Sequence, residues 1–217
     1  MDDTLYLERD YVRSGFAHVT QIIGSTQDEA DVLYAWLSTA FERGVRGDTF
    51  DRLLGAFPHL AGRTSLPALI DTYRAHPPQI TLSPGVDGAL DLLRQRGIRL
   101  AVLSDGPVSS QAGKAAALGL DRWFDPILLT ESLGPGFAKP SVAGFDRIAR
   151  TWGFSGRELA YVGDNPEKDF VGPRRLGWLT IRVRDPGQLR SAFEPASDAD
   201  RPDVEIPAIS AVLGNLR

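Results

Sequence analysis

The sequence predicts an α/β fold, in which a doubly wound parallel sheet forms the core and an all-helical segment is inserted near the start of the chain. Two hydrophobic patterns support this prediction. Apolar residues recur at helical spacing up to about residue 76, whereas short continuous apolar runs alternate with helical stretches after Pro84 and Gly85. Runs of this kind are typical of strands that are covered on both faces in a parallel sheet.

The first region predicts three or four amphipathic helices and no strand. Its apolar residues form four stripes, with glycine and proline breaks between them. The stripes are Val12, Phe16, Val19 and Ile23; Ala30, Leu33, Tyr34, Leu37 and Phe41; Phe50, Leu53, Leu54 and Phe57; and Leu66, Leu69, Ile70 and Tyr73. Pro77 and Pro78 end this region, because proline lacks an amide hydrogen and disfavours a helix before it.

The second region predicts four buried strands that alternate with helices near 86–96, 108–119, 141–153 and 167–177. The strands are Leu100–Leu103, Ile127–Leu129, Leu159–Val162 and Leu179–Val183. This alternation favours right-handed crossover connections between parallel strands. The stretch Pro186–Pro207 is rich in Pro, Asp and Ser and predicts a loop before a short terminal segment, Ala208–Leu213.

Composition excludes several function classes. The 217 residues include 24 Lys and Arg against 28 Asp and Glu, a formal charge of −4 without any basic run, so we expect no nucleic-acid partner. No cysteine is present, which excludes disulfides, thiolate metal sites and a cysteine nucleophile. No apolar run approaches the roughly 18 residues of a membrane span. We expect no membrane partner, a cytoplasmic location, and a monomer or homodimer.

Polar side chains follow the predicted strands, where ligands bind in an open parallel sheet. They are Ser104, Asp105 and Gly106 after the first run, Lys139 in the loop after the second, and Asp164 and Asp169 after the third. A hydroxyl beside backbone amides, a lysine and two carboxylates can hold a phosphate together with a hard divalent cation. This set indicates phosphoryl chemistry.

Each of these pieces also has a simpler interpretation. Ser-Asp-Gly after a strand is commonly a turn or a helix cap, and a lysine before proline is commonly a solvated loop residue. Asp164 and Asp169 could be a helix N-cap and a first-turn acid. Three such pieces in order at one sheet edge nevertheless favour the functional interpretation.

Together with Met1-Asp2-Asp3-Thr4-Leu5, the segments Ser104-Asp105-Gly106, Lys139-Pro140 and Gly163-Asp164 through Asp169 resemble the four motifs of the haloacid dehalogenase superfamily. The resemblance covers nearly the whole chain. It implies a Rossmann-like hydrolase core formed by residues 1–7 and 81–217 and a helical cap formed by residues 8–80. It also implies a Mg²⁺-dependent phosphatase that acts on a small phosphorylated metabolite.

The first motif of that family has the form Asp-x-Asp-x-Thr, with a nucleophile followed by an acid/base. The match places Asp2 at the acid/base position and Met1 at the variable position. The nucleophile and the strand before it would then lie ahead of Met1, so we expect a truncated, inactive form. A rival alignment makes Asp2 the nucleophile and puts Thr4 at the acid/base position, but Leu5 and Tyr6 then supply no following threonine.

The resemblance also implies roles for the other residues. Asp2 would protonate the departing alcohol of an aspartyl-phosphate mechanism. Phosphate would be bound by Lys139, by Ser104 and by backbone amides of the Asp105 and Gly106 segment. Mg²⁺ would be held by Asp164, the Asp2 carbonyl and Asp169, the last through water or as an outer ligand. A phosphomutase of the same family and a catalytically inactive phosphate-binding or scaffold protein are the alternatives.

Overall fold

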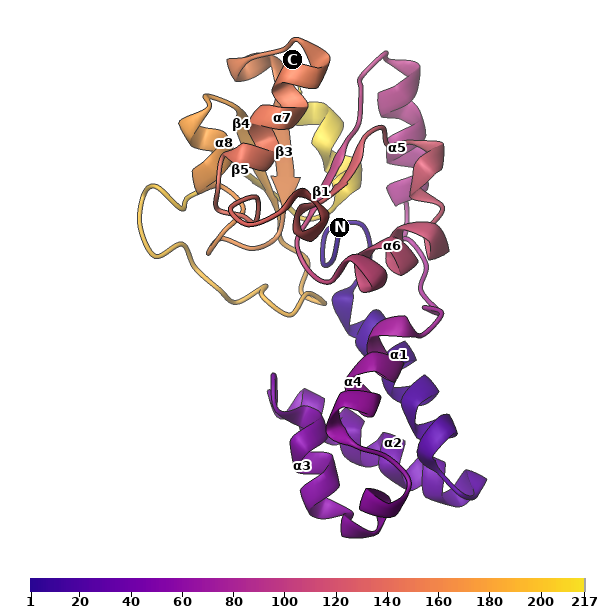
Figure 1. Ribbon diagram of the computed structural model, residues 1–217. Coiled ribbons are helices and arrows are strands. Elements are labelled where there is room, and N and C mark those ends of the chain that lie inside the picture. Colours follow the sequence, from indigo (N-terminus) through magenta and orange to yellow (C-terminus); the bar gives the residue numbers. More distant parts are fainter. Residues whose placement is uncertain (217) are drawn as a thin grey trace. The chain divides into compact units, whose positions relative to one another are not determined.

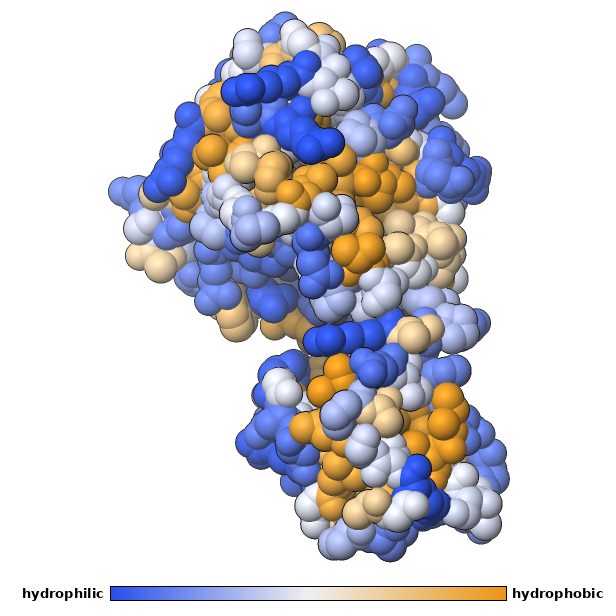
Figure 2. Space-filling view, in the orientation of Figure 1, coloured by the Kyte–Doolittle hydropathy of each residue, from blue (hydrophilic) through white to orange (hydrophobic). Residues whose placement is uncertain are grey.

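The computed structural model describes residues 1–216, which fold as two compact units (Figure 1). One unit contains Met1–Arg9 and Thr81–Arg217, and the other contains Asp10–Ile80. Within the described residues, no helix is both long and apolar enough to cross a membrane. Hydrophilic residues cover most of the visible face of each unit, with apolar residues between them (Figure 2).

The second unit is entirely helical, as the sequence predicts. Its elements are α1 (Glu8–Ile23), which begins in the first unit, α2 (Gln27–Glu42), α3 (Thr49–Ala56), a 3₁₀ turn η1 (Pro58–Gly62) and α4 (Leu66–Ala75). Thr26 and Ser65 cap α2 and α4 by accepting hydrogen bonds from the amides of Glu29 and Ala68. The predicted apolar stripes face inward, where Leu33, Leu37, Leu53 and Leu69 among others are fully buried.

The first unit confirms the α/β prediction, with every strand pair parallel. Its helices are α5 (Val86–Gln95), α6 (Val108–Ala117), α7 (Ala143–Trp152) and α8 (Val171–Arg175), with 3₁₀ turns η2 (Leu120–Arg122), η3 (Thr130–Leu133), η4 (Gly156–Glu158) and η5 (Ile209–Asn215). Its strands are β1 (Val102–Ser104), β2 (Ile127–Leu129), β3 (Ala160–Gly163), β4 (Leu179–Val183) and β5 (Val204–Ile206).

The sheet is in two parts. Strand β1 pairs with β2 in the register Val102 to Ile127, and a separate group has the order β3, β4, β5. Among the described strands, β1 and β3 are therefore each paired along one edge only. A cluster of buried apolar residues that includes Leu103, Phe145 and Trp178 joins the two parts through α7.

Two predictions of secondary structure are wrong in detail. Strand β5 lies inside Pro186–Pro207, which the sequence predicts as a loop, because only three residues pair and their middle one, Glu205, is polar and exposed. Helix α8 covers Val171–Arg175 rather than 167–177. The preceding residues form turns whose amides bond to the side chains of Asn165 and Asp169 instead of starting a helix.

Candidate active site

The carboxyl ends of β1 and β3 meet in the first unit. Ser104 ends β1 and is buried, and Asp105 follows it. The Asp105 carboxylate accepts hydrogen bonds from the Lys139 amide at 3.2 Å, the Thr130 hydroxyl at 3.0 Å and the Lys168 ammonium at 2.9 Å. Since Lys168 belongs to the loop after β3, Asp105 holds three loops together at this edge of the two sheet parts.

Lys139 and Asp169 form a buried ion pair. The Lys139 Nζ lies 2.8 Å from Asp169 Oδ1 and 2.8 Å from the Tyr161 hydroxyl of β3. Burial disfavours the charged lysine, but Asp169, Tyr161 and Asp105 outweigh this and raise the pKa of Lys139. The other Asp169 oxygen accepts the amides of Asp164 and Asn165 at 3.2 and 3.0 Å. Both Asp169 oxygens therefore have donors within the protein.

Asp164 has a different environment, since its carboxylate accepts a hydrogen bond from a hydroxyl rather than from a basic side chain. Its Oδ1 accepts only the Thr4 hydroxyl at 3.3 Å, while its backbone carbonyl accepts the buried Arg182 guanidinium at 3.1 Å. Burial and the negative charge of Asp169 raise the pKa of Asp164 to about 7. A positive charge placed beside Asp164 would restore its ionised form.

Two glycines allow the close approaches in this site. A Cβ on Gly163 would lie 2.5 Å from Asp169 Oδ2, so only glycine lets that carboxylate reach the two amides. Gly106 has a φ of 123°, and a Cβ there would lie 2.8 Å from the Gln111 amide nitrogen. The turn after β1 therefore brings the backbone close to α6.

Asp2 contacts α6 rather than the Lys139 pair. Its Oδ1 accepts from Lys114 Nζ at 2.8 Å and from the Tyr6 hydroxyl, and its Oδ2 accepts from Gln111 Nε2 at 3.1 Å. Burial raises the pKa of Asp2. The charges of the Lys114 ammonium and the Met1 amine, together with the hydrogen bonds from Lys114 and Tyr6, outweigh burial and lower this pKa to about 2. Asp2 is therefore a carboxylate at neutral pH.

The Met1 amine is also buried in this region. Desolvation lowers its pKa, and the charges of Asp2, Lys139, Asp164 and Asp169 all act on it.

This geometry agrees with the comparison with known proteins. A profile of haloacid dehalogenase-like hydrolases matches residues 1–177. The chain belongs to this family. A glyceraldehyde 3-phosphate phosphatase of Methanopyrus kandleri is 35% identical over 134 residues, 62% of this chain and 56% of that protein. A phosphoserine phosphatase of Thermus thermophilus is 32% identical over 177 residues, 75% of this chain and 68% of that protein.

The solved structures that are similar to this chain show its fold. The putative HAD-hydrolase YfnB from Bacillus subtilis, bound to magnesium, has a TM-score of 0.68 at 21% identity, covering 100% of this chain and 96% of that one. A HAD phosphatase from Thermococcus onnurineus has a TM-score of 0.60 at 19% identity, covering 100% and 94%. The match covers 56% and 50% of the first two curated relatives, about half their length.

All the site residues that the sequence predicts lie in the first unit. The Asp169 carboxylate accepts hydrogen bonds from the Lys139 ammonium and from the Asp164 backbone amide. The Asp105 carboxylate accepts a hydrogen bond from the Lys139 amide and so connects their loops. Asp2 lies on the α6 side of the site.

Sequence reasoning missed four partners of these residues, namely Gln111, Lys114, Tyr161 and Lys168. A signal for two of them exists in the sequence. Gln111 and Lys114 are spaced three residues apart on α6, so two long polar side chains lie on one face of a helix that carries the buried Ala115.

The oxygen donors of this site fit a hard divalent cation. Asp164 offers a buried carboxylate that accepts a hydrogen bond from the Thr4 hydroxyl, and the Asp2 carbonyl adds a second oxygen that lies 3.2 Å from the same hydroxyl. Among residues 1–216 no group of three or more acidic or imidazole side chains has metal-site geometry. A small number of protein ligands is sufficient for Mg²⁺, because this ion usually keeps several waters and binds one or two carboxylates.

Proposed function

We propose that this hydrolase is a Mg²⁺-dependent phosphomonoesterase that acts on a small phosphorylated metabolite. One observation carries the proposal: Ser104, Lys139 and the Asp164 and Asp169 pair lie at the joined carboxyl ends of β1 and β3. A buried cation, a hydroxyl and hard oxygen ligands are the groups that stabilise a transferring phosphoryl group. The phosphatase names of two relatives support the same reaction class.

In this proposal the nucleophile is an aspartate joined to the Met1 nitrogen, and hydrolysis of the phosphate ester depends on that aspartate. That carboxylate attacks phosphorus in line and the ester oxygen leaves, which forms an aspartyl-phosphate. Water then attacks the aspartyl-phosphate and releases phosphate.

Asp2 serves as the acid/base in both halves of this reaction. Its pKa of about 2 suits the second half, in which a carboxylate takes a proton from water. The first half needs a protonated Asp2, and loss of the contact with Lys114 would raise its pKa for that step.

Lys139 and Ser104 hold the phosphoryl oxygens in this proposal, while Asp169 keeps Lys139 charged and oriented. Mg²⁺ would be held directly by Asp164 and the Asp2 carbonyl, with Asp169 as an outer partner because both of its oxygens already accept hydrogen bonds. When bound, the metal neutralises charge that develops on phosphate oxygens. The helical unit, residues 10–80, serves as a cap that selects the leaving group, and we place the protein in the cytoplasm.

An extended chain tests the proposal. An apolar strand ending in aspartate is placed directly before Met1, and phosphate release is measured from phosphoglycolate, sugar phosphates and nucleoside monophosphates with Mg²⁺. We expect turnover that EDTA abolishes. Within the extended chain, Asp2→Asn and Lys139→Ala should each lower kcat by about 100-fold or more.

The matched control carries asparagine in place of the added aspartate and should be inactive. Brisk turnover by the chain that starts at Met1 would support the rival assignment, in which Asp2 is the nucleophile. Equal activity of the aspartate and asparagine extensions would contradict the proposed mechanism.

A further inference from the structure

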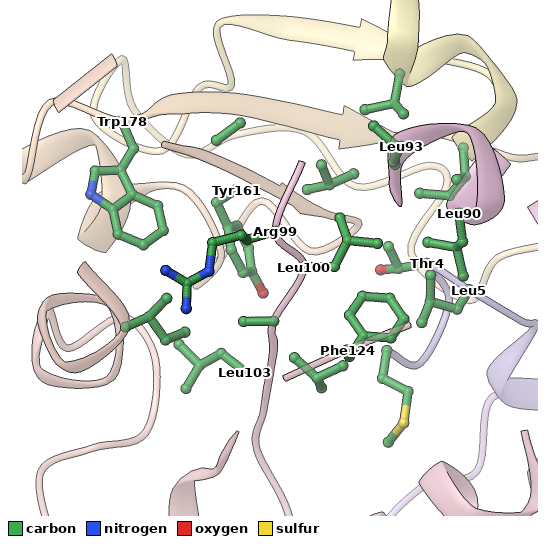
Figure 3. A pocket seen from close by; sticks show the side chains of 18 of the residues that line it. Thr4, Leu5, Leu90, Leu93, Arg99, Leu100, Leu103, Phe124, Tyr161 and Trp178 are labelled. Atoms are coloured by element: carbon green, nitrogen blue, oxygen red, sulfur yellow. The ribbon is translucent and has the colours of Figure 1, made fainter. Parts of the chain in front are cut away.

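The apolar cavity of the first unit is unsuited to the polar alcohol part of a phosphate ester. It has a volume of about 150 Å³, and leucine side chains surround it, among them Leu90 and Leu100 (Figure 3). The charged side chain in its lining is Arg99, whose guanidinium lies 5.2 Å from the centre of the Trp152 ring. The loop after β4, residues 184–193, carries polar groups of the kind that such an alcohol requires.

Arg190 lies in this loop, and the backbone around it is held on both sides. The amide of the preceding Leu189 donates to Asp3 Oδ2 at 2.8 Å, and the Arg190 carbonyl accepts from Arg182 Nη2 at 3.0 Å. Arg182 is fully buried and also donates to the Asp164 carbonyl at 3.1 Å. The loop therefore holds Arg190 at a fixed position relative to Asp164.

The side chain of Arg190 is only partly occupied by acceptors of the protein. Within residues 1–216 its guanidinium makes one hydrogen bond, from Nη1 to Glu8 Oε2 at 3.3 Å, whereas an arginine has several further N–H donors. The Arg190 side chain is 34% exposed and that of Glu8 is 28% exposed. A second carboxylate can therefore reach the remaining donors of Arg190 from solvent.

The Asp3 carboxylate brings Glu8 and Arg190 close to the acid/base of the proposed mechanism. Its Oδ1 accepts the Glu8 amide at 2.8 Å, its Oδ2 holds the Arg190 loop, and Asp3 directly follows Asp2. Burial and the charge of Asp2 raise the pKa of Glu8. Burial disfavours the charged Arg190, but Glu8 and Asp164 outweigh it and raise the pKa of Arg190. The pair therefore lies on the side of the departing alcohol, which Asp2 protonates in the proposal.

We propose that Arg190 binds a carboxylate on the alcohol part of the substrate, which makes the substrates phosphate esters of short hydroxy acids. This inference rests on the proposed function. The planar guanidinium matches a carboxylate in shape and charge. The nearby negative charges of Glu8, Asp2 and Asp3 favour a partner with one negative charge over a second phosphate group, which carries more.

The carbon chain between the phosphate and the carboxylate is short. One guanidinium, that of Arg182, contacts the carbonyls of both Asp164 and Arg190, so the backbone at these two positions lies within reach of a single side-chain group. Phosphoglycolate and 3-phosphoglycerate have the required form. Glu8 competes with the carboxylate of such an ester, because it already accepts a hydrogen bond from Arg190.

Two esters that differ in one group test the inference. Binding of 3-phosphoglycerate and of glycerol 3-phosphate, in which CH₂OH replaces the carboxylate, is measured by isothermal titration calorimetry with the 217-residue chain and Mg²⁺. Released phosphate is assayed in parallel, which separates binding from turnover. We expect 3-phosphoglycerate to bind about tenfold more tightly or better.

Three variants make the test specific. Arg190→Gln should weaken binding of 3-phosphoglycerate about tenfold or more and leave glycerol 3-phosphate unchanged, since the loop stays anchored through backbone groups. Glu8→Gln removes the competing charge and should strengthen binding of 3-phosphoglycerate alone. The matched control is Arg201→Gln, because the Arg201 side chain lies between β4 and β5 and is 69% exposed. It should change neither affinity.

Two results would overturn this inference alone. One is equal affinity of the unmodified chain for the two glycerol-derived esters, and the other is equal weakening of both by Arg190→Gln, which would indicate a merely structural role. A preference for fructose 1,6-bisphosphate over fructose 6-phosphate that Arg190→Gln abolishes would assign Arg190 to a second phosphate instead. Failure of both glycerol-derived esters to bind would contradict the proposed function as well.

Discussion

Two of the carboxylate and lysine pairs in the candidate site differ although each has an N to O distance of 2.8 Å. The Asp169 and Lys139 side chains are 2% and 7% exposed, whereas Asp2 is 20% exposed beside a Lys114 that is 6% exposed. Asp169 also accepts two backbone amides, but Asp2 accepts bonds from side chains alone.

The difference indicates that the Asp169 and Lys139 pair is a fixed group, whereas Asp2 and its partners form an adjustable one. Backbone amides keep Asp169 in place, and through it they keep Lys139 in place. Asp2 is held by the long side chains of Lys114 and Gln111, which can change rotamer without moving the backbone. Such a pair of groups suits a site that binds one charge firmly and exchanges a proton at another.

The largest expected effect comes from breaking the fixed pair. Lys139→Met leaves the buried Asp169 and Asp164 without their lysine and should lower the free energy of unfolding by about 3–5 kcal/mol. Urea denaturation measures the change. The control is Lys168→Met, which removes the 37% exposed partner of Asp105 and should cost about 1 kcal/mol or less. Equal losses for the two variants would contradict the comparison.

A smaller effect is expected from the adjustable pair. Lys114→Met should lower the free energy of unfolding by about 1–3 kcal/mol, between the values for exposed and buried pairs. It should also raise the pKa of Asp2 from about 2, because burial then acts with less opposition. Carbon-13 NMR of the Asp2 carboxyl measures that rise. An unchanged Asp2 pKa would show that Lys114 does not control its charge.

The pH dependence of metal binding should depend on a third carboxyl group, that of Asp164. The pKa of Asp164 is raised from 3.8 to about 7, so its ionisation opposes folding and lowers stability as pH increases across that interval. Mg²⁺ binds the ionised form and should therefore stabilise the protein more at pH 8 than at pH 5.

At a Mg²⁺ concentration ten times Kd the stabilisation at pH 8 should be about 1.4 kcal/mol. Thermal melts at both pH values measure it, and Asp164→Asn should remove the Mg²⁺ effect. Equal stabilisation at pH 5 and pH 8 would mean that Asp164 is not the ligand.

The sequence predicts the positions of the fixed group better than those of the adjustable one. Lys139, Asp164 and Asp169 follow strands, and parallel strands bring their carboxyl ends to one edge, so pattern alone predicts their proximity. Lys114 approaches Asp2 from a helix face, across 112 positions of sequence. That contact depends on how α6 packs beside the turn at Gly106, which hydrophobic periodicity does not specify.

The prediction of the fold from the sequence has the same limit. Apolar runs predict β1 to β4, because a continuous run of apolar residues is a signal for a strand by itself. They do not predict β5, which pairs through backbone around the exposed Glu205, nor the division of the sheet, which depends on pairing between strands far apart in sequence.

A carboxyl-carbon NMR titration with and without Mg²⁺ tests the central claim most directly. Asp164→Asn and Asp2→Asn assign the two resonances. The account predicts that Asp164 titrates near pH 7 without metal and moves to lower pH when Mg²⁺ is added, while the Asp2 side chain titrates near pH 2 in both conditions. Titration of Asp164 near its ordinary pKa of 3.8 with no response to Mg²⁺ would contradict the account.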